Sequence, residues 1–424
     1  MPAGQDNTRD CKPEICVADC NRKAKCDPGG YGPAYAKERF VRPSCAVNEN
    51  SRFGRVIGYY EVWSLRRICN KLYPEQIPAG IYTHLNFAFV GIHPETFEVV
   101  PDSQWDEDTY KRLANLKLKD RSLKVFITVG GWDFNNLGPT ATTFSDLAAS
   151  LPAQRAFARS PLRFMATYNF DGVDIDWEYP GAPDRFGREA DYINFPIFIE
   201  NLRVALHYLQ YFDIKKLAAS VDFFNLMTYD LHGVPARDPD PSTFHLNAHT
   251  NLTEIRPALD LFWRNGISPD KVTLGVAFHG RGFTARSHSC LELGCPFDSG
   301  ANALRCSREV GLAMNSEIDE LIRVRRVKET LDEAAAVKIL TWDGDQWMAY
   351  DDGETLRRKA DFAHSQCLGG VAVWAVTHDT REGKYSRLLG GVARRRYDAF
   401  VRGADEYDEV AEYEDYCRWT GCNE

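Results

Sequence analysis

The chain has 424 residues, 44% of them hydrophobic, and carries a formal net charge of −9. This length suits one large domain with an insertion, or two to three domains. The acidic balance argues against a nucleic-acid partner and suits a neutral substrate. No apolar run approaches the roughly 18 residues that a membrane span requires, so we expect no membrane partner. We also expect a monomer.

The 12 cysteines gather toward the two ends and in one internal loop, without a Cys-x-x-Cys pair. This distribution favours disulfides over a zinc site. Disulfides form in an oxidising compartment, which predicts an extracellular protein. Residues 1–6 do not begin a basic-then-apolar signal peptide, and a missing leader would reconcile the two observations.

Three segments follow from composition along the chain. Residues 1–53 are rich in Cys, Pro and Gly without periodicity, and we interpret them as an N-terminal remnant. Residues 54–394 hold the alternating apolar patterns of a folded domain. Residues 395–424 are acidic and aromatic, and we expect them to form a disordered tail.

Apolar runs predict strands at residues 55–63, 83–90 and 124–132. Helical patterns follow the second and third strands, at about residues 107–117 and 144–168. Strands that alternate with helices imply parallel βαβ units, and this spacing is typical of a (β/α)8 barrel. Functional residues of such a barrel lie at the carboxyl ends of its strands.

The most informative stretch is residues 170–180, which read FDGVDIDWEYP. Alternation with period two places Asp174, Asp176 and Glu178 on one face of a strand, opposite an apolar face. Burial and crowding raise carboxyl pKa values, most usefully for Glu178 at the open end of the strand. A carboxylic acid that is protonated near neutral pH can protonate the leaving oxygen in glycosidic bond cleavage.

Two other readings of this stretch remain open. An Asp-x-Asp pair also suits a divalent cation, which would make a metal-dependent enzyme. The acidic face could instead be a solvated edge, although the apolar residues on the opposite face argue against that.

The acidic positions also resemble a known signature. Asp171-x-x-Asp174-x-Asp176-x-Glu178 is similar to the Asp-x-x-Asp-x-Asp-x-Glu motif of glycoside hydrolase family 18, the chitinases. Trp132 follows two glycines, as in the family's Ser-x-Gly-Gly-Trp, with Thr128 in place of Ser. The resemblance covers about residues 55–390 and points to the fungal killer-toxin-alpha-subunit-like branch, truncated at both ends.

The fifth barrel strand has no counterpart in the sequence. Residues 221–230 match the family's sixth strand, yet only 40 residues, 181–220, separate them from the acidic strand. A helix at about 191–206 takes up part of this interval, which contains no β-branched apolar run. We therefore expect an α/β fold with a (β/α)8 TIM-type barrel that is incomplete at strand 5 and exposes two strand edges.

The seventh and eighth strands are predicted at residues 272–283 and 369–376. The long interval between them predicts a small α+β insertion at about residues 284–352, held together by Cys290, Cys295 and Cys306. His279 stands where the family usually has Tyr. A single His at a strand end is more often structural than catalytic, so we assign it no role.

The resemblance implies an endochitinase-type glycoside hydrolase that cleaves β-1,4-linked N-acetylglucosamine in chitin with retention and with assistance from the substrate. Glu178 would donate the proton, Asp176 would stabilise the oxazolinium charge, and Asp174 would share a proton with Asp176. Tyr229 would hydrogen-bond to the acetamido group. No cofactor or metal is implied. The substrate-binding residues would be Tyr59, Phe89, Trp132, Met227, Asp230, Arg281 and Trp374.

A non-catalytic chitin-binding protein, lectin-like or toxin-subunit-like, is the alternative. Lectin relatives in the family typically lose the terminal acid, so the presence of Glu178 favours the enzyme. The missing strand favours the alternative. Trp374 could also be an ordinary core residue rather than the surface on which a sugar ring stacks.

Overall fold

The computed structural model describes residues 41–47, 52–101, 103, 106–206, 214–234 and 244–393. Most of the predicted N-terminal remnant, and the whole predicted tail, lie outside the described residues. Within them, no helix is both long enough and apolar enough to cross a membrane.

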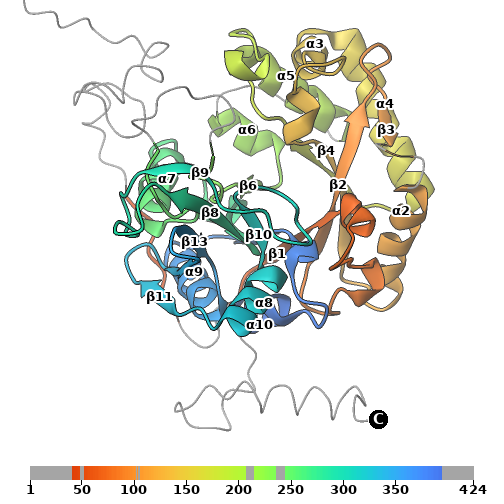
Figure 1. Cartoon of the computed structure of the whole chain (residues 1–424). Coiled ribbons are helices and arrows are strands. Elements are labelled where there is room, and N and C mark those ends of the chain that lie inside the picture. The colour runs from red at the N-terminus through yellow and green to blue at the C-terminus, as the bar shows by residue number, and fades with distance from the viewer. Residues whose placement is uncertain are drawn as a thin grey trace, which may run out of the picture.

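The centre of the fold is a sheet of parallel strands in the order β5-β4-β2-β1-β14-β7-β6 (Figure 1). The strands are β1 (Arg55–Glu61), β2 (His84–Ile92), β4 (Lys124–Gly130), β5 (Gly172–Asp176), β6 (Phe224–Leu226), β7 (Val272–Ala277) and β14 (Gly370–Trp374). A short strand, β3 (Val99–Pro101), pairs antiparallel with β2. Each parallel strand overlaps the residues of a predicted strand, and this agreement confirms the barrel-type fold.

The barrel is open, as the sequence predicts. Strands β5 and β6 end the strand order, and no strand lies between them in the described part of residues 177–223. Two helices, α5 (Asp191–Leu206) and α6 (Ile214–Ser220), occupy that interval. The predicted strand at 221–230 is wrong in length: β6 covers only Phe224–Leu226, because it has a single partner strand, β7.

Helices cover the outer side of the sheet, and Figure 1 shows α2 and α4 along β2 and β4. The α-helices of this layer, besides α5 and α6, are α2 (Asp106–Asn115), α3 (Thr143–Ala149), α4 (Leu151–Tyr168), α7 (Leu252–Arg264), α9 (Gly353–Ser365) and α10 (Lys384–Ala393). Short 3-10 helices are η2 (Val62–Arg66), η3 (Pro74–Gln76), η4 (Leu116–Leu118), η5 (Trp132–Asn135), η6 (Pro183–Arg185), η8 (Pro269–Lys271) and η9 (Val376–His378).

The single helix predicted at 144–168 is in fact two helices, α3 and α4. Ser150 separates them, and its hydroxyl accepts a hydrogen bond from the Ala153 amide as the N-cap of α4. Pro152 in the first turn favours the same start, because proline lacks the N–H that an interior position would need. Helix α4 ends at Asn169, which adopts the left-handed conformation (φ 61°).

The main apolar core lies between the parallel sheet and the helices. Val56, Phe87 and Val125 on the strands belong to one buried cluster with Tyr110 of α2 and Phe157 of α4. Each fully buried large apolar side chain contributes about 2 kcal/mol to stability. The core therefore holds the strands in register even though the barrel does not close.

A second sheet is inserted between β7 and β14. Its antiparallel strands follow the order β10-β8-β13-β12-β11, with β9 paired to β8. They are β8 (His279–Ala285), β9 (Phe297–Gly300), β10 (Leu312–Met314), β11 (Glu329–Asp332), β12 (Val337–Trp342) and β13 (Gln346–Tyr350), accompanied by α8 (Asn315–Arg325).

This insertion begins at His279 rather than near residue 284. The predicted strand 272–283 is divided at Phe278, whose amide bonds to the carbonyl oxygen of Trp374 in the barrel sheet. The next residue, His279, already pairs antiparallel with Met314. The change of partner explains why one continuous apolar run forms two strands.

Three disulfides lie within the described residues: Cys45–Cys367, Cys69–Cys306 and Cys290–Cys295. They confirm that the six cysteines in the described part of the chain pair as disulfides. The prediction that Cys290, Cys295 and Cys306 together hold the insertion is only half right, because Cys306 bonds to Cys69, which follows η2 of the barrel. That bond fastens the insertion to the barrel.

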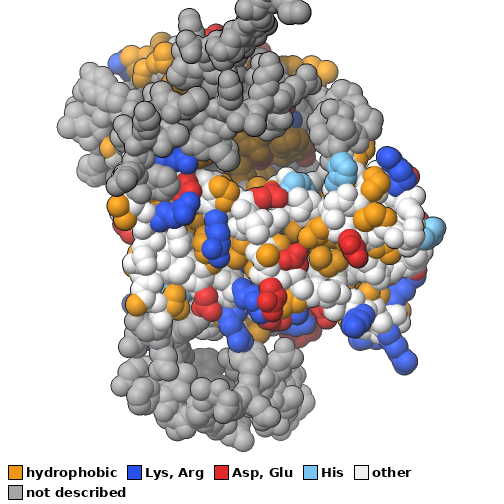
Figure 2. All heavy atoms as spheres, turned by 90° about the vertical axis from the view of Figure 1, so that its left-hand side faces the viewer, with side chains coloured by type: hydrophobic (Ala, Val, Ile, Leu, Met, Phe, Trp, Pro, Cys, Tyr) orange, Lys and Arg blue, Asp and Glu red, His pale blue; other side chains and the backbone are white. Residues whose placement is uncertain are grey.

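Charges of both signs are interspersed on the face that Figure 2 presents, the left-hand side of Figure 1. Among the described residues of this face, Lys and Arg side chains lie beside Asp and Glu rather than in a field of one sign. Such a surface gives little long-range attraction for a polyanion.

We predict that the two disulfides of the insertion differ in their contribution to stability. Cys69–Cys306 spans 237 residues of sequence and Cys290–Cys295 spans 5, and a long closure restricts the unfolded chain more. Replacing Cys69 and Cys306 by Ser should lower the free energy of unfolding by about 5 kcal/mol, against about 2 kcal/mol for the matched Cys290/Cys295 pair. Denaturant titration measures both, and an equal or larger loss in the short pair would contradict the argument.

Candidate active site

The acidic residues lie where β5 leaves the sheet. The strand ends at Asp176, earlier than the predicted end at Pro180, because the Trp177 ring is buried between Phe144 and Phe195 at centroid distances of 5.2 and 5.0 Å. Glu178 therefore follows the strand rather than extending it. Its side chain is still largely buried, with 8% of the residue exposed.

Asp174 is the point where several strands meet. Its Oδ2 accepts hydrogen bonds from the Tyr59 hydroxyl (2.8 Å), the Thr128 hydroxyl (3.1 Å) and the Asn86 amide (3.2 Å). Asn225 of β6 donates in turn to the Tyr59 hydroxyl oxygen at 2.9 Å. Burial raises the pKa of Asp174, while these neutral donors oppose the rise.

Asp176 and Glu178 retain protons more strongly than exposed carboxyls do. Burial raises the pKa of Asp176 well above its usual value, and the charges of Glu178 and Asp174 raise it further. Burial also raises the pKa of Glu178; a hydrogen bond with Tyr179 and the charge of Arg185 oppose this, and the charge of Asp230 adds to it. The site thus favours a protonated carboxyl beside an ionised one.

Arg185 in η6 holds the segment after Glu178. Its Nε donates to the Glu178 carbonyl oxygen at 3.1 Å and its Nη1 to Asn136 at 2.8 Å. The guanidinium also lies 3.7 Å from the ring centre of Trp132. Trp132 remains 45% exposed beside the acidic residues, with one ring face covered by Arg185.

Aromatic side chains form the floor of the site. Trp374, half-buried at the end of β14, lies 5.4 Å from Tyr59, 5.6 Å from Phe89 and 6.3 Å from Trp63, measured between ring centres. These rings belong to one apolar cluster inside the barrel. A flat apolar surface of this kind suits the C–H face of a sugar ring.

The remaining predicted residues lie just after β6 and in β8: Met227, Tyr229, Asp230 and Arg281. Met227 is 40% exposed, and burial strongly raises the pKa of Tyr229. Asp230 takes the left-handed conformation (φ 56°) and accepts two hydrogen bonds from Arg281, at 2.8 and 2.7 Å. Burial alone would raise the pKa of Asp230, but the charge of His279 and the bonds from Arg281 bring it well below its usual range.

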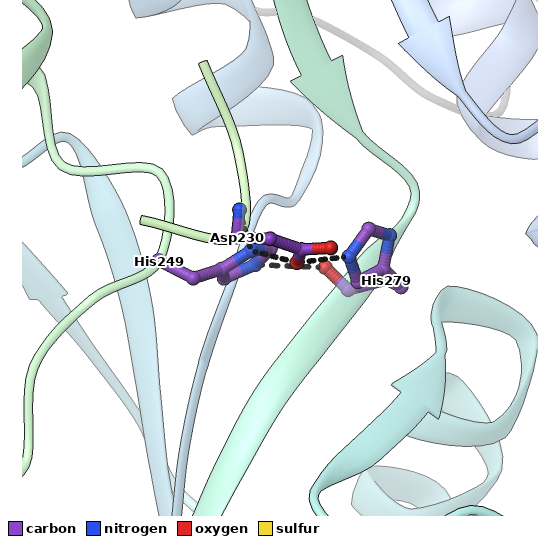
Figure 3. Close-up of side chains that lie close together, drawn as sticks. All are labelled: Asp230, His249 and His279. Atoms are coloured by element: carbon purple, nitrogen blue, oxygen red, sulfur yellow. Dashed lines mark hydrogen bonds and ion pairs between the residues drawn. The ribbon is translucent and has the colours of Figure 1, made fainter. Parts of the chain in front are cut away.

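Asp230, His249 and His279 are also the group of described residues whose spacing could accommodate a metal ion, with one ligand atom each within 4.8 Å of one another. Figure 3 shows both rings beside the Asp230 carboxylate. Because the Arg281 guanidinium already forms two hydrogen bonds with that carboxylate, its positive charge opposes a cation there. The expectation that no metal takes part stays a prediction.

Hydrogen bonds and charge interactions link seven of the residues selected from the sequence: Tyr59, Asp174, Asp176, Glu178, Tyr229, Asp230 and Arg281. Ring contacts join Phe89 and Trp374 to Tyr59, and Arg185 joins Trp132 to the main chain of Glu178. The structure also adds residues to which the sequence analysis assigned no role, and these lie around the selected ones: Asn86, Thr128, Asn225, Arg185, Trp63, His249 and His279. Asn86 and Thr128 could have been found as polar residues on otherwise apolar strands next to the acidic one. Nothing in the local sequence marks His249.

Comparison with models of known protein families identifies the family of this chain. The model for glycosyl hydrolases family 18 matches residues 55–379. The chain belongs to this family. The resemblance drawn from the acidic motif is therefore confirmed, and it places the chain among the glycoside hydrolases.

Individual relatives agree with the family. The secreted chitinase LysM12 of Penicillium expansum is 29% identical over 88% of this chain and 28% of its own length. The killer toxin subunits alpha/beta of Kluyveromyces lactis are 29% identical over 72% of this chain and 27% of that protein. The chain thus spans about a quarter of the length of these two relatives.

Solved structures show the same fold. Catalytic domain 2 of the Ostrinia furnacalis Group II chitinase superposes with a TM-score of 0.70 at 26% identity, over 81% of this chain and 97% of that domain. A mutant of the same domain is known in complex with penta-N-acetylchitooctaose, (NAG)5.

We predict that Asp176→Asn stabilises the protein at neutral pH. The pKa of Asp176 is higher in the folded than in the unfolded chain, so its ionised form destabilises the fold as pH rises from the usual 3.8 toward the folded value. Removing the charge should therefore raise the free energy of unfolding at pH ~7.5 and have little effect at pH ~4.

Asp171→Asn in the same motif is the matched control. Asp171 forms an ion pair with Lys117 at 2.9 Å, so its loss should weaken the fold rather than strengthen it. Denaturant titrations of the three proteins at both pH values measure the differences. A stabilisation of Asp176→Asn that did not depend on pH would show that repulsion between carboxylates is not its cause.

Proposed function

We propose that the protein is a chitinase that hydrolyses β-1,4-N-acetylglucosamine linkages by retaining, substrate-assisted catalysis. The observation that carries this is the row of partly or fully buried carboxyls from Asp174 to Glu178 with raised pKa values, next to the aromatic floor at Trp374. Acid catalysis needs a protonated group near neutral pH, and sugar binding needs a flat apolar surface.

In the first step, the acetamido oxygen of the bound sugar attacks its own anomeric carbon as Glu178 protonates the leaving glycosidic oxygen. The C–O bond breaks and a cyclic oxazolinium ion forms. Asp176, ionised at this stage, would accept the acetamido N–H and stabilise the positive charge. Asp174 shares a proton with Asp176 and is fixed by the Tyr59, Thr128 and Asn86 donors.

In the second step, water attacks the anomeric carbon, the bond between that carbon and the acetamido oxygen breaks, and the water gives a proton to the Glu178 carboxylate. The acid and the acetamido group are restored, and the second inversion at the anomeric carbon gives net retention of configuration. Tyr229 would hydrogen-bond to the acetamido group. The other substrate contacts would come from Tyr59, Phe89, Trp132, Met227, Asp230, Arg281 and Trp374.

Relatives support the substrate and the compartment. The Penicillium relative is named a secreted chitinase, and the Ostrinia domain binds a chitin oligosaccharide. Disulfides in the described residues fit an oxidising compartment. We therefore propose that the protein acts outside the cell on chitin or its oligosaccharides, as a monomer and without metal or cofactor.

The second candidate function is chitin binding without catalysis. The open barrel favours it, because the acidic residues and Tyr229 lie on or just after the two strands beside the gap, β5 and β6. Every residue of these two strands is partly exposed. A site with a mobile or hydrated wall could bind a sugar chain yet fail to exclude water from the reacting bond.

Glu178→Gln separates the two candidates. Gln keeps the size and hydrogen bonding of Glu but cannot give up a proton, so the release of sugar from a chitin oligomer should fall by about 10²–10⁴. Oligomer affinity, measured by titration calorimetry, should change little. An unmutated protein that folds and binds oligomers but releases no sugar would establish the binding function instead.

Trp374→Ala tests the aromatic floor. Loss of the stacking surface should weaken oligomer binding by about 1–3 kcal/mol. Tyr168→Ala is a matched control, because Tyr168 ends α4, and α4 ends at the opposite, amino end of β5. Unchanged affinity in Trp374→Ala would mean that Trp374 belongs only to the core.

A further inference from the structure

His279 lies between two parts of the site that the sequence does not connect. Its Nε2 is 2.9 Å from the Asp230 Oδ1, and its Nδ1 is 3.2 Å from the carbonyl oxygen of Trp374. The imidazole is fully buried. It therefore links the segment that follows β6, through Asp230, to the end of β14, through the Trp374 main chain.

Both polar partners of the His279 ring are hydrogen-bond acceptors. A carbonyl oxygen can only accept, and so can an ionised carboxylate. Both nitrogens of His279 must therefore carry hydrogen to satisfy both contacts, which makes the ring an imidazolium.

His249 has the opposite pattern. Its Nε2 lies 3.1 Å from the His279 carbonyl oxygen and must donate. Its Nδ1 lies 3.2 Å from the Asp230 amide N–H and also 3.2 Å from the Asp230 Oδ1, and it accepts the N–H when the ring is neutral. Burial lowers the pKa of His249 to about 4, which favours the neutral ring; the bond with Asp230 opposes this shift, and the charge of His279, with ring centres 4.9 Å apart, adds to it.

We propose that His279 is a positioning residue that acts through Asp230: as an imidazolium it ties the Asp230 carboxylate to the Trp374 main chain, while neutral His249 holds the Asp230 amide. Figure 3 shows that the two rings come from separate segments of the chain. The pair sets the position of Asp230 relative to the sugar floor. Its effect on substrate rests on the proposed function, whereas its protonation pattern does not.

Several charged groups surround His279. Asp230 contacts it from the segment after β6, and His249 from the loop before α7, while Arg281 lies two residues further along the same strand, β8. His378 of η9 lies edge-on at 5.5 Å, and its Nε2 is 3.1 Å from Glu61 of β1. Arg67 also pairs with Glu61. The Asp230 carboxylate is the negative group in direct contact with the His279 ring, so it is the group that stabilises the imidazolium.

The contacts of His279 and Arg281 with the Asp230 carboxylate, called the clamp below, also affect Glu178, the proposed proton donor. An Asp230 held in its ionised form by His279 and Arg281 adds negative charge near Glu178, and this charge raises the pKa of Glu178 in addition to burial. The clamp thus helps the site to keep both a fixed carboxylate and a protonated one.

The first test needs no activity. Long-range proton–nitrogen NMR spectra of protein labelled with ¹⁵N-histidine distinguish an imidazolium from the two neutral forms of the ring. At neutral pH we expect His279 doubly protonated and His249 protonated on Nε2 alone, assigned by the signals lost in His279→Gln and His249→Gln. A neutral His279, or a His249 protonated on Nδ1, would overturn the proposal.

The second test is a double-mutant cycle on oligomer hydrolysis. His279→Gln removes the charge and one of the two bonds, so KM should rise about tenfold with a smaller change in kcat. In an Asp230→Asn background the same substitution should add little, because the two residues act as a unit. His288→Gln, an exposed histidine of the insertion, is the control that should leave KM unchanged.

A purely structural role predicts another result. It would lower the fraction of active protein, and with it the apparent kcat, at unchanged KM and equally in both backgrounds; that outcome would refute the positioning role. If the unmutated protein hydrolyses nothing, the proposed function fails, and the same cycle is measured on the dissociation constant of the oligomer. The NMR result stands independently of both.

Discussion

The fold and the site both depend on the hydrogen bonds that converge on one oxygen, Oδ2 of Asp174. Its donors, Tyr59, Asn86 and Thr128, come from β1, β2 and β4, so a single buried carboxylate joins four strands across the interior. A buried carboxyl without such partners would be strongly destabilising. With them, the strands are fixed relative to one another at the end of the sheet where the acidic residues lie.

The open barrel makes this convergence more important. All residues of β5 and β6 are partly exposed, whereas four of the five in β14 are buried. The sheet has no strand to lock its two edges together within the described residues. Asn225 of β6 nevertheless bonds to the Tyr59 hydroxyl, which itself donates to Asp174 of β5. Side chains in the interior thus connect the edges that the missing strand leaves apart.

The sequence predicts what depends on local pattern and fails where distant residues meet. The acidic motif and the strand periodicity were sufficient for the barrel, its missing strand and the catalytic candidates. The division at Phe278 was missed because it depends on a bond to Trp374, and periodicity does not show a change of partner strand. His249 was missed because it lies in a loop and reaches Asp230 only through the tertiary fold. Arg185 likewise acts through the main chain of Glu178.

The aspartate pKa values are shifted in opposite directions on the two sides of the site. Asp174 accepts hydrogen bonds from neutral donors, and among the described residues no basic side chain forms an ion pair with it or with Asp176. Burial therefore raises the pKa of both. Asp230 instead faces Arg281 and His279, and it stays ionised. Its charge in turn favours the protonated form of Glu178. In the proposed mechanism, the proton for glycosidic cleavage would thus depend on the surroundings of Glu178 as much as on that residue itself.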